Sequence, residues 1–112
     1  MKTQKIDLFA FKKLVDGNKP FVVKFKSEGC HLCTELQPEY ESVAEKYQAI
    51  PFYDVDVDEE EELANLFIED GVPTIYYIQG KSFNELEYPE KGYDKKSLIK
   101  LIKKQIGGSN GK

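Results

Sequence analysis

A short apolar strand that leads into a Cys-x-x-Cys pair constrains this chain more than any other feature. Residues 21–26 alternate as a strand, with Phe21, Val23 and Phe25 on one face, and Cys30 and Cys33 follow at the start of a predicted helix. Two intervening residues let the two sulfurs meet with little backbone movement. A helix N-terminus stabilises the thiolate, which is the reactive form of a cysteine. The arrangement therefore predicts a dithiol that cycles between reduced and disulfide forms.

Two other interpretations of the same residues are open. Cys30, His31 and Cys33 are all ligands for soft metals, but a structural zinc site usually takes four protein ligands and the sequence holds no second Cys or His cluster. Cys30 and His31 are also adjacent and poorly placed to converge on one ion. Inert core thiols are disfavoured by polar neighbours, namely Ser27, Glu28 and Thr34. We therefore expect redox chemistry without a metal or a bound cofactor.

Composition limits the class of protein. A chain of 112 residues is one domain and buries enough surface to fold without a metal or a structural disulfide. Its net charge of −4 argues against nucleic acid as a partner, because phosphate binding needs a basic face. No apolar run approaches the roughly 20 residues of a membrane span, and residues 1–7 lack the apolar centre of a signal peptide. We expect a cytoplasmic protein, in which two cysteines are more often catalytic than structural.

Strand and helix patterns alternate along the chain. Strands are predicted near residues 5–6 and at 21–26, 51–57, 74–78 and 82–88, the last two forming a hairpin. Two helices are predicted in the first half of the chain, one from Leu8 to Gly17 with Asp7 as its N-cap, and one at 32–48 that contains Pro38. Two more are predicted in the second half. One runs from an N-cap at Asp58 to Gly71, with Glu59–Glu62 as its first turn, and the other runs from an N-cap at Asp94 to Ile106. This order favours an α/β domain over residues 1–106, with a parallel core and antiparallel edge strands. Residues 107–112 are predicted to be a flexible tail.

Two charge runs could be docking patches. One is the acidic run Glu59–Glu62, and the other is the set of lysines near the end of the chain, Lys95, Lys96, Lys100, Lys103 and Lys104. The simpler interpretation is that both are solvated helix faces, because acidic groups favour the first turn of a helix and cations the last.

Four marks in order make the chain resemble the thioredoxin family from about Ile6 to Ile106. They are Cys30-His31-Leu32-Cys33 after a strand, Pro38 five residues beyond Cys33, Val72-Pro73-Thr74 before a strand, and Gly92 before the last helix. The resemblance implies a three-layer sandwich with a central mixed sheet flanked by four helices. It also implies a cis peptide bond before Pro73, facing the cysteines, and a substrate-binding surface formed by Gly29, Leu32, Val72 and Pro73.

The chain departs from the family pattern at three places. Gly29 stands where these proteins usually carry Trp, His31-Leu32 replaces Gly-Pro between the cysteines, and Lys24 replaces a buried Asp six residues before the first cysteine. Lys24 and a protonated His31 add positive charge near the thiols and so favour the thiolate. We therefore predict a dithiol more oxidising than an ordinary thioredoxin, above about −270 mV.

The resemblance implies a thiol–disulfide oxidoreductase. Cys30 is expected to attack a substrate disulfide as thiolate, and Cys33 to resolve the mixed disulfide. The implied partners are disulfide-containing protein substrates and an electron donor, which is either a thioredoxin-reductase-like protein or a small thiol. The protein itself is expected to be a monomer. The alternative is an adaptor or redox sensor of the same fold, whose dithiol switches partner binding without general turnover.

Overall fold

The sheet that carries the motif is mixed and has five strands in the order β1-β3-β2-β4-β5. In the computed structural model, which describes residues 3–68 and 71–109, the elements are β1 (Gln4–Lys5), α1 (Leu8–Asp16), β2 (Phe21–Lys26), α2 (His31–Lys46), β3 (Phe52–Asp56), α3 (Glu61–Phe67), β4 (Thr74–Gln79), β5 (Ser82–Glu85) and α4 (Lys95–Ser109). Strands β1, β3 and β2 are parallel, while β4 runs antiparallel to both β2 and β5. The predicted mixed sheet is confirmed.

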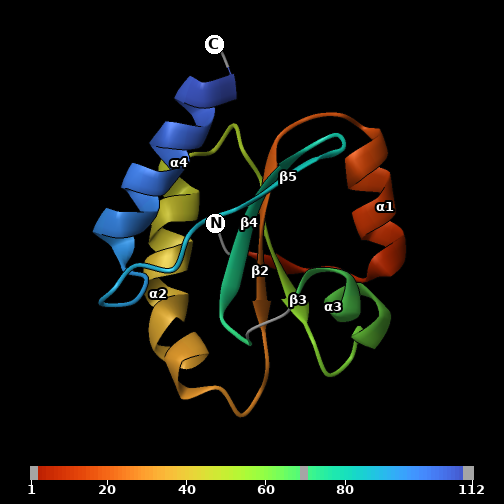
Figure 1. The fold of residues 1–112 in the computed structure, drawn as a ribbon, viewed down its shortest axis with the longest axis horizontal. Helices are drawn as coiled ribbons and strands as arrows, with labels where there is room; N and C mark the ends of the chain where they lie inside the picture. Colours follow the sequence, from red (N-terminus) through yellow and green to blue (C-terminus); the bar gives the residue numbers. More distant parts are fainter. Residues whose placement is uncertain (1–2, 69–70, 110–112) are drawn as a thin grey trace.

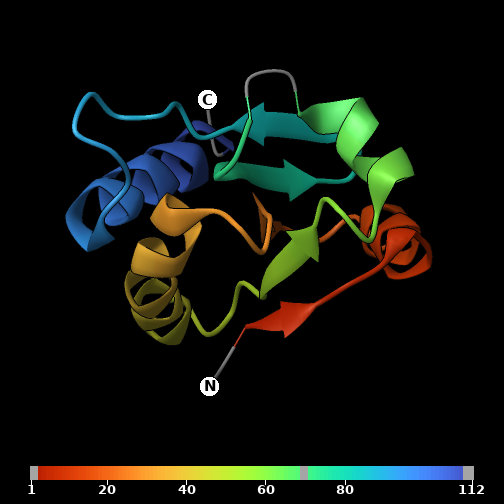
Figure 2. The ribbon, with the colours of Figure 1, turned by 90° about the horizontal axis from the view of Figure 1, so that it is seen from below.

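Helices cover both faces of this sheet. Figure 1 shows α2 and α4 on one side of the strands and α1 and α3 on the other, and Figure 2 shows the same three layers from below. The alternation of β2 explains the arrangement, because Val22 joins the core beneath α2 and α4 while Phe21, Val23 and Phe25 join the core beneath α1 and α3. The three-layer sandwich with four helices is confirmed.

Helix α2 carries the motif at its N-terminus. It is continuous through Pro38, and its buried residues Leu36, Tyr40 and Val43 lie at helical spacing against the sheet. The predicted start and end differ from the observed ones by one or two residues, which is the usual uncertainty at helix ends. Packing of α2 against both the sheet and α4 therefore holds the cysteines at one end of the molecule (Figure 1).

The predicted start of α3 is wrong. Asp58 does not cap this helix, which begins at Glu61 behind a Glu60 cap that makes no side-chain hydrogen bond. Instead the buried carboxylate of Asp56 accepts hydrogen bonds from the backbone N–H groups of Asp58 (2.9 Å) and Glu59 (3.3 Å). This local turn takes up the residues that would otherwise form the first helical turn, because a short acidic side chain competes for backbone donors.

The predicted end of α3 is also wrong. The helix ends at Phe67, with Ile68 in extended conformation, and does not reach Gly71. Its buried residues are Leu63 and Ala64, whereas Leu66, on the other side of the helix, is 70% exposed.

The last helix continues beyond its predicted end. Asp94 caps it as expected, with Oδ1 accepting from the Ser97 N–H at 2.8 Å. The helix then runs to Ser109, so residues 107–109 of the predicted tail are helical, and residues 110–112 lie outside the described part of the chain. Ile106, in the turn before, packs against the core and supports these final residues.

Candidate redox site

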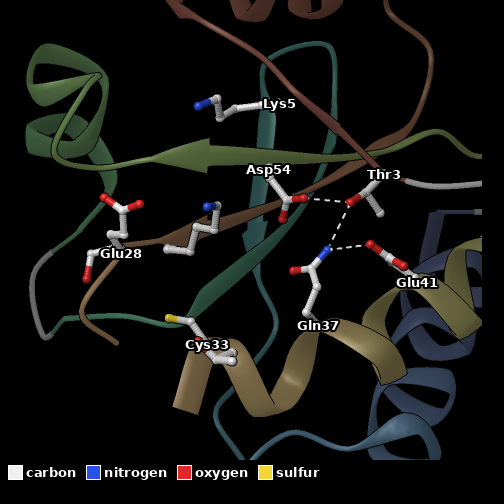
Figure 3. A pocket seen from close by; sticks show the side chains of 10 residues that line it. Thr3, Lys5, Glu28, Cys33, Gln37, Glu41 and Asp54 are labelled. Atoms are coloured by element: carbon white, nitrogen blue, oxygen red, sulfur yellow. Dashed lines mark hydrogen bonds between the residues drawn. The ribbon is translucent and has the colours of Figure 1, made fainter. Parts of the chain in front are cut away.

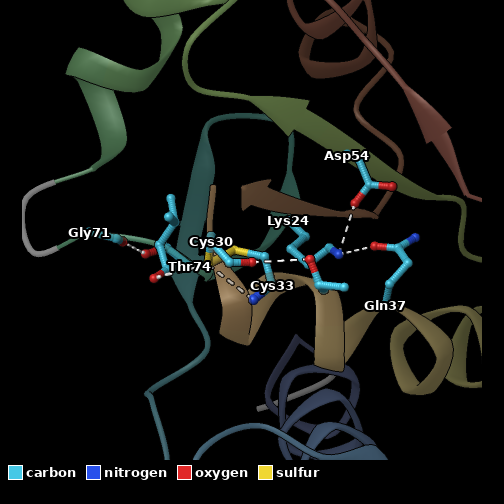
Figure 4. Close-up of a disulfide and its surroundings, with 9 residues drawn as sticks. Lys24, Cys30, Cys33, Gln37, Asp54, Gly71 and Thr74 are labelled. Atoms are coloured by element: carbon cyan, nitrogen blue, oxygen red, sulfur yellow. Dashed lines mark hydrogen bonds and ion pairs between the residues drawn. A yellow bond between two sulfur atoms is a disulfide. The ribbon is translucent and has the colours of Figure 1, made fainter. Parts of the chain in front are cut away.

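Cys30 and Cys33 form a disulfide at the N-terminus of α2 (Figure 4), with their Cα atoms 5.2 Å apart. Cys30 is the N-cap residue of the helix, and its Sγ accepts a hydrogen bond from the backbone N–H of Cys33 at 3.0 Å. A free N–H of the first helical turn is a donor that stabilises a thiolate at the same position. The geometry thus favours negative charge on Cys30 when the disulfide is reduced.

The two cysteines differ in access to solvent. Cys30 is half-buried, whereas Cys33 is only 3% exposed because the first turn of α2 directs it toward the sheet. An incoming disulfide therefore meets Cys30 first, and Cys33 lies behind it. This difference supports the predicted order of attack, in which Cys30 is the nucleophile and Cys33 the resolving thiol.

The loop before β4 approaches Cys30 from the other side. The Val72–Pro73 peptide bond is cis, as the sequence resemblance implied, and the carbonyl oxygen of Val72 lies 3.9 Å from Cys30 Sγ. The hydroxyl group of Thr74 donates to the Gly71 carbonyl oxygen at 2.5 Å and fastens the loop. Val72 and Pro73 are therefore next to the disulfide although about 40 residues separate them from it in sequence.

Gly29 and Leu32 leave the other rim of the disulfide open. Gly29 is exposed, and a Cβ atom added there would meet nothing within 4 Å. Leu32 is 51% exposed and presents an apolar side chain beside the cysteines. Gly29, Leu32 and Val72 thus lie around Cys30 with part of each residue accessible, whereas Pro73, which was predicted to share this surface, is buried behind Val72.

His31 projects into solvent and pairs with its own helix. Its side chain is 83% exposed, and Nε2 lies 3.0 Å from Oε2 of Glu35, one turn along α2. When His31 is protonated, this carboxylate offsets part of its positive charge. The tuning role of His31 stays a prediction, with Glu35 as a partner that sequence spacing alone would have revealed.

Lys24 is wholly buried at the centre of the sheet. Its Nζ lies 3.4 Å from Asp54 Oδ1, donates to Gln37 Oε1, and lies 4.8 Å from the centroid of the Tyr40 ring. Burial lowers the pKa of Lys24, and the Asp54 carboxylate opposes that shift. The cation expected beneath the motif is therefore present but paired, so its effect on the thiols is smaller than that of an isolated charge.

A polar cavity of about 400 Å³ opens beside Cys33 (Figure 3). Its lining includes Asp54, Gln37 and Thr3, which form a chain of hydrogen bonds: Thr3 Oγ1 donates to Asp54 Oδ2 at 2.6 Å, and Gln37 Nε2 donates to Thr3 Oγ1 at 3.2 Å. Sequence reasoning missed these three residues. The available signal was the carboxylate of Asp54 on the same predicted strand face as the apolar Phe52.

Two properties of the described residues bear on the other classes of site. Among the described residues, no group of three or more His, Cys, Asp or Glu side chains is placed to hold a metal ion. Within residues 3–68 and 71–109, no helix has the length and apolar character needed to cross a membrane.

Comparison with known proteins agrees with this site. The family model described as Thioredoxin matches residues 2–104. A thioredoxin of Ophiophagus hannah is 31% identical over 90 residues, which is 80% of this chain and 83% of that protein. A protein disulfide-isomerase of Aspergillus niger is 30% identical over 98 residues, which is 84% of this chain but 27% of that longer protein.

Solved structures of thioredoxins share the fold of this chain. The crystal structure of chloroplastic thioredoxin z superposes with a TM-score of 0.80 at 24% identity, covering 96% of this chain and 97% of that one. The fold and the Cys30–Cys33 pair together support thiol–disulfide oxidoreductase chemistry in general. With its sheet, its dithiol at the start of α2 and a family match over nearly its whole length, the chain belongs to the thioredoxin family.

Proposed function

We propose that this protein reduces disulfide bonds in protein substrates. The single observation that carries the proposal is the position of Cys30 as N-cap of α2, with the Cys33 N–H directed at its sulfur and the Cys33 side chain buried behind it. This arrangement provides one stabilised, accessible thiolate and one protected thiol within bonding reach. Both are needed for two-step disulfide exchange.

In the first step the Cys30 thiolate attacks one sulfur of the substrate disulfide. A mixed disulfide forms, and the other substrate sulfur leaves as a thiolate. In the second step Cys33 attacks Cys30 Sγ, the mixed disulfide breaks, and the substrate leaves fully reduced. The two electrons gained by the substrate come from the protein dithiol, which ends as the Cys30–Cys33 disulfide. A thioredoxin-reductase-like protein or a small thiol then restores the dithiol.

The proposed substrate is an extended segment of a disulfide-containing protein. Support comes from the carbonyl oxygen of Val72, 3.9 Å from Cys30 Sγ, which lies where a backbone N–H of such a segment could donate to it. The open space at Gly29 and the exposed side chain of Leu32 leave room on the opposite rim for the neighbouring residues of the segment. We further propose that the protein acts as a monomer in the cytoplasm.

Turnover of a disulfide substrate tests the proposal. The parent protein should accelerate the reduction of insulin by dithiothreitol, and Cys30→Ser should abolish this activity. Because the sequence contains two cysteines in all, Cys33 is the one thiol left in this variant, and it is buried. A parent that binds partners differently in its reduced and oxidised states, yet does not turn over, would be an adaptor or sensor instead.

A further inference from the structure

The last helix carries a charge opposite to that of the rest of the protein. Helix α4 holds five of the 16 lysines of the chain and none of its 20 acidic residues. Within residues 3–68 and 71–109, no ion pair involves a lysine of this helix. A basic helix face is commonly solvated, but it indicates a binding surface where it borders a groove with apolar lining.

Three of these lysines line a groove of about 760 Å³. Lys100, Lys103 and Lys104 line it from α4, and Glu87 and Glu90 line it from residues 86–94, which join β5 to α4. Figure 2 shows this connecting segment turning back beside α4. The groove therefore has a basic side, formed by α4, and an acidic side, formed by the connecting segment.

Apolar groups from both elements lie between the two sides. Tyr88 is 46% exposed, and Pro89 and Leu101 are half-buried. A partly exposed aromatic ring within a polar rim is a typical anchor for a partner. The groove thus offers apolar contact flanked by charges of opposite sign.

The groove is formed without a partner. The inner face of α4 packs into the core, and the backbone N–H of Lys95 donates to Glu39 Oε1 of α2 at 2.7 Å. In the connecting segment, the Tyr93 hydroxyl donates to the Leu86 carbonyl oxygen, and its ring meets the ring of Tyr88 edge-on, with centroids 5.0 Å apart. A partner would therefore bind without having to order either side first.

We infer that this groove docks an amphipathic helix of a partner protein. Such a helix presents an apolar stripe to Tyr88 and Leu101, acidic side chains to the basic side of the groove, and basic side chains to the acidic side. A helix can present three such faces because successive residues turn by about 100°, whereas a strand has two faces. The inference goes beyond the proposed function, since the described residues that line this groove include neither cysteine.

The acidic side of the groove favours a polypeptide over other partners of a basic surface. Nucleic acids and anionic membranes present phosphate groups throughout, and Glu87 and Glu90 would repel them. The apolar face of α4 is also closed to a membrane, because Leu98 and Ile102 are fully buried in the core. A polypeptide helix can carry both signs of charge beside an apolar stripe.

Fluorescence anisotropy with a designed peptide tests the inference. The probe is an end-blocked, fluorescein-labelled helix with a leucine stripe, glutamates along one flank and lysines along the other. It should bind the parent at least roughly tenfold more tightly than a scrambled peptide of the same composition, and added salt should weaken the binding. Tyr88→Ala should lose at least roughly tenfold in affinity, whereas Phe83→Ala, which removes an exposed ring of β5, should bind like the parent.

Reversing one side of the groove separates docking from a loss of structure. Lys100→Glu/Lys104→Glu makes both sides acidic, so it should lose at least roughly tenfold in affinity for the probe and bind instead a version with lysines on both flanks. Glu87→Lys/Glu90→Lys makes both sides basic and should prefer a version with glutamates on both flanks. A variant that had merely lost its structure would bind neither version.

The matched control lies on the same helix. Lys95→Glu/Lys96→Glu makes the same change of charge outside the groove and should bind the probe within about twofold of the parent. All these variants should reduce insulin as fast as the parent. A parent that binds the probe but does not reduce insulin would contradict the proposed function and support the docking groove.

Three results would overturn the inference. They are equal binding of the probe and its scrambled form, an equal loss in Lys95→Glu/Lys96→Glu and Lys100→Glu/Lys104→Glu, and failure of the reversed variants to bind their matched probes. Self-association of the parent that Lys100→Glu/Lys104→Glu abolishes would also overturn it, because the groove would then join two copies. So would binding of a DNA duplex or of anionic lipid vesicles as tightly as the probe.

Discussion

Lys24 and Asp54 are register partners on the adjacent parallel strands β2 and β3, and they form an ion pair in the interior of the domain, with Lys24 Nζ 3.4 Å from Asp54 Oδ1. Lys24 is fully buried and Asp54 nearly so. Each charge stabilises the other, because burial weakens the solvation of either one alone.

Breaking this pair should destabilise the fold more than removing it. Lys24→Met or Asp54→Asn alone leaves one buried charge without its partner and should lower the free energy of unfolding by about 3–5 kcal/mol. The double variant should recover most of that loss. Urea unfolding of the four proteins measures the coupling, and additive losses would show that the two charges are independently solvated.

Replacing the resolving thiol should trap substrates. Cys33→Ser leaves the mixed disulfide on Cys30 without an internal attacker, so covalent complexes should accumulate and disappear on addition of dithiothreitol. Non-reducing electrophoresis followed by mass spectrometry identifies the linked cysteine. Trapping in Cys30→Ser but not in Cys33→Ser would reverse the two roles.

The His31–Glu35 pair should tune the redox potential in opposite directions. A protonated His31 places a positive charge near Cys30, so His31→Gly should make the dithiol more reducing, whereas Glu35→Gln removes the opposing negative charge and should make it more oxidising. One pK unit of thiolate stabilisation corresponds to about 30 mV for two electrons, so shifts of tens of millivolts are expected.

Equilibration with glutathione measures these potentials, and Glu62→Gln in the first turn of α3 is the control for losing one carboxylate. Equal potentials for the parent, His31→Gly and Glu35→Gln would exclude the histidine as a tuning group. The parent itself should lie above about −270 mV.

The cap of α4 should give a contribution to stability that depends on pH. Hydrogen bonds from the N–H and hydroxyl groups of Ser97 lower the pKa of Asp94 below its ordinary value of 3.8. A carboxyl with a lower pKa in the folded state stabilises the protein above its unfolded pKa, and loses this effect as the pH falls through the folded value. Asp94→Ala should therefore be less stable than the parent at pH 6, with the difference disappearing toward pH 2.

Thermal unfolding across this pH range tests the expectation. Asp58→Ala is the control, because the carboxylate of Asp58 does not cap α3. A destabilisation by Asp94→Ala that persists unchanged at pH 2 would show that the helix loses something other than this charged cap.

A large side chain at position 29 should change substrate use without harming the fold. Gly29 has open space around the Cβ position, so Gly29→Trp should alter stability by less than about 0.5 kcal/mol. The new ring would cover one rim of Cys30, and kcat/KM for a protein disulfide should change more than for a small aromatic disulfide. Equal changes for both substrates would place Gly29 outside the substrate surface.

Sequence patterns predicted the sheet and its two covered faces because alternation along β2 and helical spacing along α2 are local signals. They did not reveal the partner of Lys24, since the strand register that brings Asp54 beside it joins residues 30 positions apart. The start of α3 was also missed, because a single side chain, Asp56, redirects the backbone before the helix starts. Polar networks inside a fold depend on such pairings between elements, and a pattern within one element does not encode them.

Thr3 has a practical consequence for anyone who works with this protein. Its hydroxyl group bridges Asp54 and Gln37 and lines the cavity beside Cys33. A change engineered at Thr3 would therefore act beside the buried resolving thiol, although 30 residues separate the two positions in sequence. Recombinant forms meant for redox measurements should therefore keep Thr3 unchanged and place added groups near the end of α4, which lies at the opposite end of the fold from the start of α2 (Figure 1).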